Sequence, residues 1–290
     1  MARGVYRATP FEGRTPAGGA VNPGTALSRR PARLRVSPFD RRLLRVDSIE
    51  SPVPCLLVFG ARNLGRAIAK QLAAEGWDVA ATAMSGDSLE RVGSEIPGAL
   101  TIVADARSGE DVERAFARTR ERFGRIDLVV VAISPSTGGR TFGGGGIAEA
   151  DAEVFAPYLE DLLPALTTIM RVGALVLSDQ GGGTYVQITG GSARRGMAGR
   201  GPWAAAAFAT RGLVQAAAIE LREKGVHVAL LIVDASIESE KTADRLAGQP
   251  AEASTSEEDV ARAVAYLAAQ SPRGWTHELQ LTPAGDRWVP

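Results

Sequence analysis

After residue 50, short apolar runs of strand length alternate with longer segments in which apolar residues recur every three or four positions. The first pattern is typical of buried strands and the second of amphipathic helices. Strands are predicted over residues 55–59, 78–83, 99–103, 126–133, 184–189, 226–233 and 277–281. The run over 126–133 is continuous and rich in valine, as in a central parallel strand that is covered on both faces.

Helices are predicted from Gly65 to Gly76 and over residues 88–94, 112–123, 150–177, 203–224 and 260–270. Ser108 is expected to cap the third of these helices, and Thr255 with Glu258 the last. Pro164 is expected to interrupt the helix over 150–177. Strands that alternate with helices imply right-handed crossovers and one doubly wound, Rossmann-like parallel sheet. We therefore predict a single α/β domain over residues 51–290, with ligands at the carboxyl ends of its strands.

The glycine turn after the first strand is a candidate phosphate site. Gly60 ends the apolar run and Gly65 opens the helix, so backbone N–H groups at the helix start can receive a pyrophosphate that no side chain blocks. The spacing G-x-x-x-x-G is neither the dinucleotide fingerprint G-x-G-x-x-G nor a Walker A loop. By itself, the turn is also consistent with an ordinary tight connection in any α/β protein.

Charge is unevenly placed, although the chain of 290 residues has a formal net charge of zero. Residues 1–46 hold ten arginines against Glu12 and Asp40, with much Pro, Gly, Ser and Thr. Because this stretch has no helical or alternating period, we expect residues 1–50 to be a disordered arm. A transit peptide is one alternative, whereas a flexible tail or a start codon placed too far upstream explains the composition more simply. The neutral total charge gives no sign of nucleic-acid binding.

The remaining composition limits the chemistry further. An apolar share of 45% supports a buried core. No run of about 18 apolar residues and no signal-peptide core occurs, so we expect a cytoplasmic protein without a membrane segment. Cys55 is the one cysteine and lies in a predicted buried strand, which excludes an intrachain disulfide and a cysteine-based metal site. His227 and His277 lie in apolar stretches and are expected to be structural. No metal is predicted.

Residues 54–285 resemble a short-chain dehydrogenase/reductase (SDR). The residues that carry the resemblance are Gly60-Ala61-Arg62-Asn63-Leu64-Gly65-Arg66-Ala67-Ile68-Ala69, Ala104-Asp105, Ile126-Asp127-Leu128-Val129, Gly212-Leu213 and Ala218-Ile219-Glu220-Leu221. Their order and spacing cover nearly all of the predicted folded part, and the resemblance implies the family's sheet with a nicotinamide dinucleotide across its edge.

The resemblance implies that Gly60 and Gly65 lie against the pyrophosphate and that Asp105 bonds the adenine. The turn is one residue shorter than the family's T-G-x-x-x-G-x-G and lacks its middle glycine. The second strand ends without the acidic residue that bonds a ribose 2′-hydroxyl. Arg62, with Ser85 opposite, could instead accept a 2′-phosphate, which favours NADP(H) if a dinucleotide binds; the alternative for Arg62 is a solvated loop charge. The expected cofactor-binding residues are Gly60, Arg62, Asn63, Leu64, Gly65, Ser85, Asp105, Ala132 and Ser239.

The family's catalytic residues are missing at the matching positions. Counting back from Glu220-Leu221 places the tyrosine and lysine of Y-x-x-x-K on Trp203 and Ala207. The catalytic serine falls on Gly190, or on Thr189 if the register slips by one, and the family's asparagine falls near Asp161. Indole has no ionisable proton near neutral pH, so Trp203 cannot act as a general acid.

Other residues near the predicted site leave the catalytic group open. Thr189 and Arg194 are the candidates for orienting or protonating a substrate. Arg194, Arg195 and Arg200 together could bind an acidic ligand or polarise a carbonyl, whereas a solvated loop is the simpler role for them.

Three functions are consistent with these residues. The first is a degenerate SDR that keeps the dinucleotide-binding fold and acts in binding, regulation or assembly. The second is an atypical NADP(H)-dependent oxidoreductase whose proton comes from water, from Thr189 or from the substrate. The third is a non-redox enzyme, such as a dehydratase or cyclase, on the same sheet. The resemblance implies a homodimer or homotetramer through the long helices, and a dinucleotide and a small molecule as possible ligands.

Overall fold

The computed structural model describes residues 53–135, 142–240 and 242–286. All of them belong to the unit Ser51–Pro290. The predicted arm over residues 1–50 lies outside the described residues, and so does residue 241.

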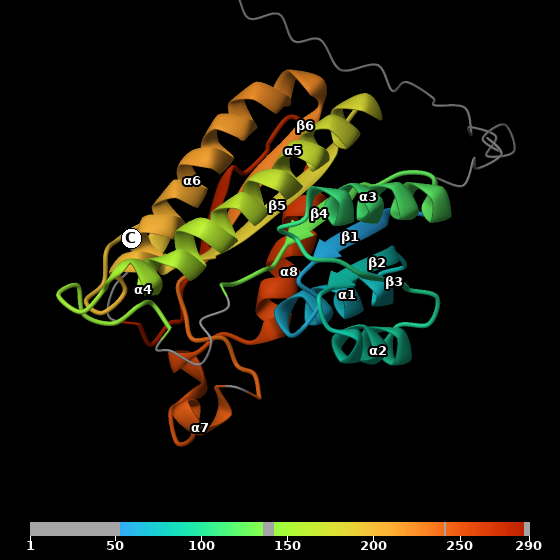
Figure 1. The fold of residues 1–290 in the computed structure, drawn as a ribbon. Coiled ribbons are helices and arrows are strands. Elements are labelled where there is room, and N and C mark those ends of the chain that lie inside the picture. The colour runs from blue at the N-terminus through green and yellow to red at the C-terminus, as the bar shows by residue number, and fades with distance from the viewer. Residues whose placement is uncertain (1–52, 136–141, 241, 287–290) are drawn as a thin grey trace, which may run out of the picture. The chain divides into compact units, whose positions relative to one another are not determined.

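Seven parallel strands form one sheet in the order β3-β2-β1-β4-β5-β6-β7 (Figure 1). The order reverses at β1, between β2 and β4, which is the switch point of a doubly wound sheet. The predicted Rossmann-like architecture is therefore confirmed. The strands are β1 (Cys55–Phe59), β2 (Asp78–Ala83), β3 (Leu100–Val103), β4 (Leu128–Val131), β5 (Gly183–Gly190), β6 (Val226–Val233) and β7 (Glu278–Leu281).

Helices cover both faces of the sheet, and each face has its own hydrophobic core. On one face α3, α5 and α6 pack over β-strand side chains such as Phe59 and Tyr185. On the other face α1, α2 and α8 pack over Val58 and Leu231. The helices are α1 (Leu64–Ala74), α2 (Gly86–Glu95), α3 (Gly109–Phe123), α4 (Ala152–Ala156), α5 (Leu163–Asp179), α6 (Gly201–Leu221), α7 (Ala243–Leu246) and α8 (Glu257–Ala268).

The long helix predicted over 150–177 is divided, as Pro164 indicated. A π-helical segment, Pro157–Leu162, joins α4 to α5. Pro164 lies in the first turn of α5 and has no N–H for the carbonyl one turn before it. The wider π turn accommodates this missing bond.

The helical stretch Ala152–Asp179 contains an 18-residue window with a mean hydropathy of 1.4, so by length and composition alone it could cross a membrane. Its side chains Leu166, Ile169 and Met170 are buried against the sheet core. We therefore assign it as a core segment of the domain.

Most predicted boundaries shift by one to three residues, and the two most informative differences concern β4 and the start of α8. The run over 126–133 yields only β4, Leu128–Val131, because the chain leaves the ladder at both ends. The cap of α8 is Ser256, whose hydroxyl accepts a hydrogen bond from the Asp259 N–H at 3.0 Å. Thr255, the predicted cap, instead bridges to Ile237 in the preceding loop.

Candidate functional site

The glycine turn is closely packed at the carboxyl ends of β1 and β2. The N–H groups of Gly60 and Ala61 both donate to the Thr82 carbonyl, at 3.1 and 2.9 Å, and Arg62 N–H donates to the Gly60 carbonyl at 2.9 Å. A Cβ atom at Gly65 would lie 2.5 Å from the Gly60 oxygen. The short turn therefore keeps its own first N–H groups occupied.

The start of α1 nevertheless suits an anion. Its first turn holds no acidic side chain, and Asn63 makes no side-chain capping bond. The first N–H groups of a helix lack intrahelical partners and lie at the positive end of its dipole. With Leu64 half-buried and Gly65 buried, the donors left for a pyrophosphate are those of the helix start rather than those of the turn.

Two exposed side chains flank this turn. Arg62 and Ser85 are both exposed and follow β1 and β2, in which Phe59 is the register partner of Thr82. Arg62 forms no ion pair with the residues that the structure describes, so its charge remains available to a phosphate.

Asp105, expected to bond the adenine, is held by a neighbour that the sequence reasoning missed. Arg107 contacts its carboxylate through Nε and Nη2, the latter at 2.8 Å, and reaches Asp161 at 3.4 Å. The hydrogen bond from Arg107 lowers the pKa of Asp105. Asp105 is therefore an ionised acceptor whose oxygens are already in use. The sequence did contain a signal for this ion pair, because Arg107 follows Asp105 by only two residues.

Two further predicted residues line the ends of the neighbouring strands. Ala132, half-buried, follows β4 and donates its N–H to the Phe59 carbonyl at 2.9 Å. Ser239 lies in the loop after β6, where its N–H donates to Thr242 Oγ1 at 2.9 Å. A backbone carbonyl therefore fixes the position of Ala132, and a side-chain hydroxyl fixes that of Ser239.

Gly190 and Trp203, the positions predicted to match the catalytic serine and tyrosine, lie close together. Gly190 ends β5 and Trp203 lies in the first turn of α6. A Cβ atom at Gly190 would lie 3.4 Å from Trp203 Nε1. Ala207, one turn further along α6, is buried in the core with an exposed fraction of 1%. An indole N–H and the apolar side chain of Ala207 therefore stand at the positions that were predicted to match the tyrosine and lysine of Y-x-x-x-K.

Aromatic side chains that the sequence reasoning did not assign surround Trp203. Phe142 and Tyr158 lie 5.4 and 6.2 Å from it, between ring centroids. The Tyr158 hydroxyl accepts a hydrogen bond of 2.8 Å from the Gly143 N–H, and the Gly143 carbonyl accepts one of 3.4 Å from the Trp203 N–H of the backbone. The chain after residue 141 is thereby tied to the start of α6.

The candidate residues Thr189 and Arg194 are placed differently. Thr189 is 7% exposed and lies in β5 beside Gly190. Arg194 points to Glu278, whose carboxylate lies 3.5 Å away and also receives two bonds from Arg211, at 2.7 and 2.8 Å. Arg195, the second arginine of the loop, pairs with Asp234 at 3.3 Å. Two of the three loop arginines are thus engaged by carboxylates of this chain.

Asp234 is the acidic residue of this region that sequence reasoning missed. It follows β6 directly, and the rule that ligands lie at the carboxyl ends of strands was the signal that would have found it.

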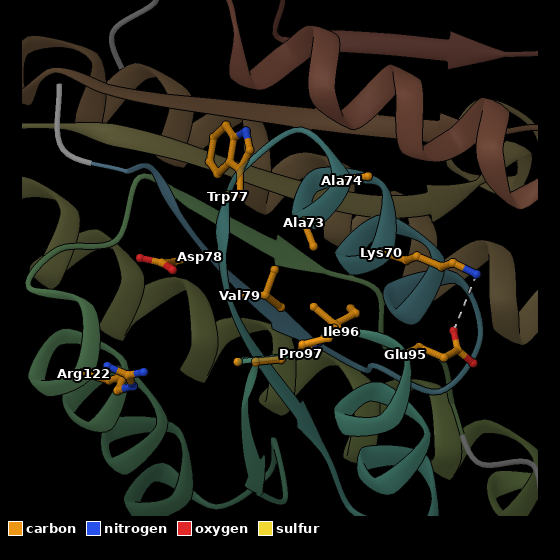
Figure 2. A pocket seen from close by; sticks show the side chains of 12 residues that line it. Lys70, Ala73, Ala74, Trp77, Asp78, Val79, Glu95, Ile96, Pro97 and Arg122 are labelled. Carbon is orange, nitrogen blue, oxygen red and sulfur yellow. Dashed lines mark ion pairs between the residues drawn. The ribbon is translucent and has the colours of Figure 1, made fainter. Parts of the chain in front are cut away.

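A pocket of about 450 Å³ lies at the other end of the sheet, where β2 begins (Figure 2). Trp77 forms one wall, and Val79 and Ile96 contribute apolar surface. At its rim Lys70 lies 3.9 Å from Glu95. This pocket and the glycine turn are separated by the length of β2, so the predicted site does not use it.

Comparisons with known proteins agree with this arrangement. A family model described as enoyl-(acyl carrier protein) reductase matches residues 59–279, which is most of the chain. The chain belongs to the short-chain dehydrogenase/reductase family. The SDR fold also accounts for the strand order and for the position of the glycine turn.

Curated relatives of this SDR are enzymes by name. This chain is 29% identical over 171 residues to 1,6-dihydroxycyclohexa-2,4-diene-1-carboxylate dehydrogenase of Pseudomonas putida, and the match covers 58% of this chain and 61% of that protein. It is 28% identical over 187 residues to the NADPH-dependent pterin aldehyde reductase of Arabidopsis thaliana, covering 63% of this chain and 75% of that protein.

Solved structures repeat the fold. A short-chain dehydrogenase from Rhodopseudomonas palustris is 25% identical, with a TM-score of 0.65, and the match covers 79% of this chain and 98% of that one. An alcohol dehydrogenase from Thermococcus sibiricus, complexed with 5-hydroxy-NADP, matches with a TM-score of 0.68 at 24% identity, over 82% of this chain and 100% of that one.

Proposed function

We propose that this SDR is a cytoplasmic NADP(H)-binding protein that does not reduce carbonyl compounds by the family's standard mechanism. The observation that carries the proposal is that the Trp203 indole faces the side-chain position of Gly190, where a Cβ atom would lie 3.4 Å from Nε1, with Ala207 buried one turn away. Indole only donates a hydrogen bond and has no proton to give near neutral pH. Alanine supplies no cation to lower the pKa of a neighbouring acid. A role in binding, regulation or assembly then remains for a chain that keeps the fold.

The residues at the glycine turn fit a dinucleotide phosphate. The open start of α1 suits the pyrophosphate, and the exposed Arg62 suits a 2′-phosphate through charge-assisted hydrogen bonds. No acidic side chain ends β2 to prefer a 2′-hydroxyl. Bound NADPH would supply a hydride from its nicotinamide ring.

Calorimetric titration of the full chain with NADPH, NADP⁺, NADH and NAD⁺ tests the cofactor. We expect binding of the phosphorylated pair, and we expect Arg62→Ala to weaken it about tenfold, the equivalent of roughly 1.4 kcal/mol. Arg118→Ala, an exposed arginine on α3, is the matched control and should leave all four affinities unchanged. Equal loss of NADPH and NADH affinity in Arg62→Ala would contradict its role as selector. A panel of aldehydes and ketones should give no turnover at a rate typical of the family.

The second candidate function is an atypical oxidoreductase. It is favoured by one observation: an indole N–H and a buried carboxyl, that of Asp234, still flank the end of β5. Proton transfer contributes only about 10²–10⁴-fold to a rate, so a hydride acceptor that is held and polarised there would react at a reduced rate.

We also propose that the protein is a homodimer through α6. Apolar residues occur all round this helix, which is typical of a helix that is covered on every side. Phe208 and Ile219 are exposed by 46% and 74%. Ala205, Phe208, Ala209, Gly212, Ala216 and Ile219 form an exposed stripe of apolar and small residues, and the exposed Gln215 and Glu220 lie beside it.

This stripe is self-complementary about Gly212. Residues four positions before and after it are Phe208 and Ala216, and residues seven positions away are Ala205 and Ile219. In an antiparallel pair of α6 helices that cross at Gly212, each large side chain meets a small one of the partner. Such a two-fold contact is the isologous type that most dimers use.

Phe208→Glu should convert the dimer into a monomer, because the interface between the two α6 helices would then bury two carboxylates without partners. The mass in solution, measured by light scattering after size exclusion, checks this. Tyr266→Glu on α8, which replaces another exposed aromatic residue, should leave the mass unchanged. A wild-type monomer would contradict the assembly proposal.

A further inference from the structure

Asp234 lies beside the vacated serine position. Val233, the last residue of β6, is the register partner of Gly190, and Asp234 follows it. A Cβ atom at Gly191 would lie 1.8 Å from Asp234 Oδ1. The carboxyl group thus fills the side-chain space of Gly191, next to the residue that faces the Trp203 indole.

This carboxyl group is buried, with 8% of its side chain exposed. Arg195 lies 3.3 Å from Oδ2, and Gln280 Nε2 lies 3.4 Å from the same oxygen. Burial raises the pKa of Asp234, and the positive charge of Arg195 opposes this rise. Two weaker influences are the charge of Asp286, which raises the pKa, and that of Arg200, which lowers it. The net direction is upward, so the protonated form persists above the ordinary range of an aspartic acid.

The hydrogen bonding of Gln280 is compatible with a protonated Asp234. Gln280 Oε1 is buried without a partner among the described residues, while Nε2 faces Asp234 and Thr282 Oγ1. Rotation of this amide by half a turn would place Oε1 where it accepts from a carboxyl O–H and from the Thr282 hydroxyl. That rotation would move Nε2 to the position that Oε1 now occupies, so one polar atom of Gln280 stays unpaired with either protonation state of Asp234.

Other carboxyl groups at the site differ from Asp234. The hydrogen bonds from Arg107 lower the pKa of Asp105, and those from Arg211 lower the pKa of Glu278. Both are ionised acceptors near neutral pH and cannot give a proton there.

We propose that Asp234 is the proton donor that replaces the missing tyrosine when a carbonyl group is reduced. The proposal rests on the second candidate function above. The carbonyl carbon receives a hydride from the reduced nicotinamide dinucleotide, forming a C–H bond as the carbonyl π bond opens. The oxygen takes the Asp234 proton. The products are an alcohol, the oxidised dinucleotide and an Asp234 carboxylate, which Arg195 stabilises.

The protonation of Asp234 is tested first on the full chain without any ligand. A raised folded-state pKa contributes stability below the unfolded value, near pH 3.9, that is lost as pH rises through the folded pKa. Asp234→Asn, which mimics the neutral acid, should therefore melt close to wild type near about pH 4 and above it near about pH 8.

Glu278→Gln is the matched control with the opposite sign. The pKa of Glu278 is lowered, so its stabilising contribution is present above about pH 4.5 and lost as pH falls. This variant should melt below wild type near about pH 8 and approach it in acid. If Asp234→Asn followed the same course, Asp234 would be an ionised partner of Arg195 and the proposal would be overturned.

Turnover is tested next, with NADPH and a panel of aldehydes and ketones. We expect slow reduction whose kcat/KM falls as pH rises through the pKa of Asp234, and a loss of about 10²-fold or more in Asp234→Asn, with a flat pH profile. NADPH affinity by calorimetry should not change in this variant. Bound NADPH without turnover, or with turnover that Asp234→Asn leaves intact, overturns the role of Asp234. Absence of NADPH binding overturns the proposed cofactor instead, so the two failures are distinct.

Discussion

Replacing Gly60 with alanine should destabilise the folded domain by about 3 kcal/mol and lower its melting temperature by roughly 6–12 °C. Gly60 has a φ of 92°, a value that L-residues rarely adopt, and a Cβ atom there would lie 2.8 Å from the Ala132 carbonyl oxygen. Gly60 and Ala132 directly follow β1 and β4, which pair with each other, so neither backbone segment can move without disturbing that pairing. Thermal unfolding of the full chain, followed by circular dichroism, measures the effect.

Gly98→Ala separates the two causes. Gly98 has a φ of 86°, yet no heavy atom lies within 4 Å of the position its Cβ would take. Alanine at Gly98 should therefore cost only the conformational part, about 1–2 kcal/mol. Equal losses in the two variants would show that the close approach of Gly60 to Ala132 has no energetic weight.

Tyr185→Phe should stabilise the protein by about 1–2 kcal/mol, because it removes a buried hydroxyl without a described partner. Tyr185 is 2% exposed, and its ring lies against the helix α5 at Gly173. Its hydroxyl oxygen forms no hydrogen bond with any residue of the described ranges. Burial raises the pKa of this phenol, so it stays neutral and the phenylalanine ring reproduces its packing. The free energy of unfolding in urea measures the gain.

Tyr158→Phe is the matched control with the opposite sign. Tyr158 is also buried, at 1% exposure, but its hydroxyl accepts the hydrogen bond from Gly143 N–H. Loss of that acceptor leaves a buried donor unpaired and should cost about 1–2 kcal/mol. Destabilisation by both substitutions would mean that Tyr185 has a partner after all.

The fold could be predicted from the sequence because its signals are local. The apolar runs of β1, β2 and β6 coincide with the observed strands, residue for residue. Ser108 was recognisable as a cap, and its hydroxyl does accept from the Asp111 N–H. The start of α8 could not be predicted in this way. Ser256 and Thr255 are both able to cap a helix, and the bridge between Thr255 and the distant Ile237 decides between them.

The site was less accessible to sequence reasoning, because its partners come from distant elements. Nothing near Arg194 in the chain points to Glu278, which lies in β7. The contact between Asp234 and Gly191 joins the ends of two strands and depends on their register. The spacing of the family motif predicts that Gly190 and Trp203 belong to one site, and a Cβ atom at Gly190 would lie 3.4 Å from Trp203 Nε1.

The central place of β1 has a consequence for synthesis on the ribosome. β1 is complete at Phe59, but one of its two neighbours, β4, ends only at Val131, about 70 residues later. At roughly 5–20 residues per second, the β4-facing edge of β1 waits about 4–14 s for its partner. During that time the backbone N–H and carbonyl groups on the β4-facing edge of β1, which belong to alternate residues of this apolar strand, are unpaired, a state that invites pairing with other nascent chains. Chaperone binding to the nascent chain should therefore concentrate on the interval between the emergence of β1 and that of β4.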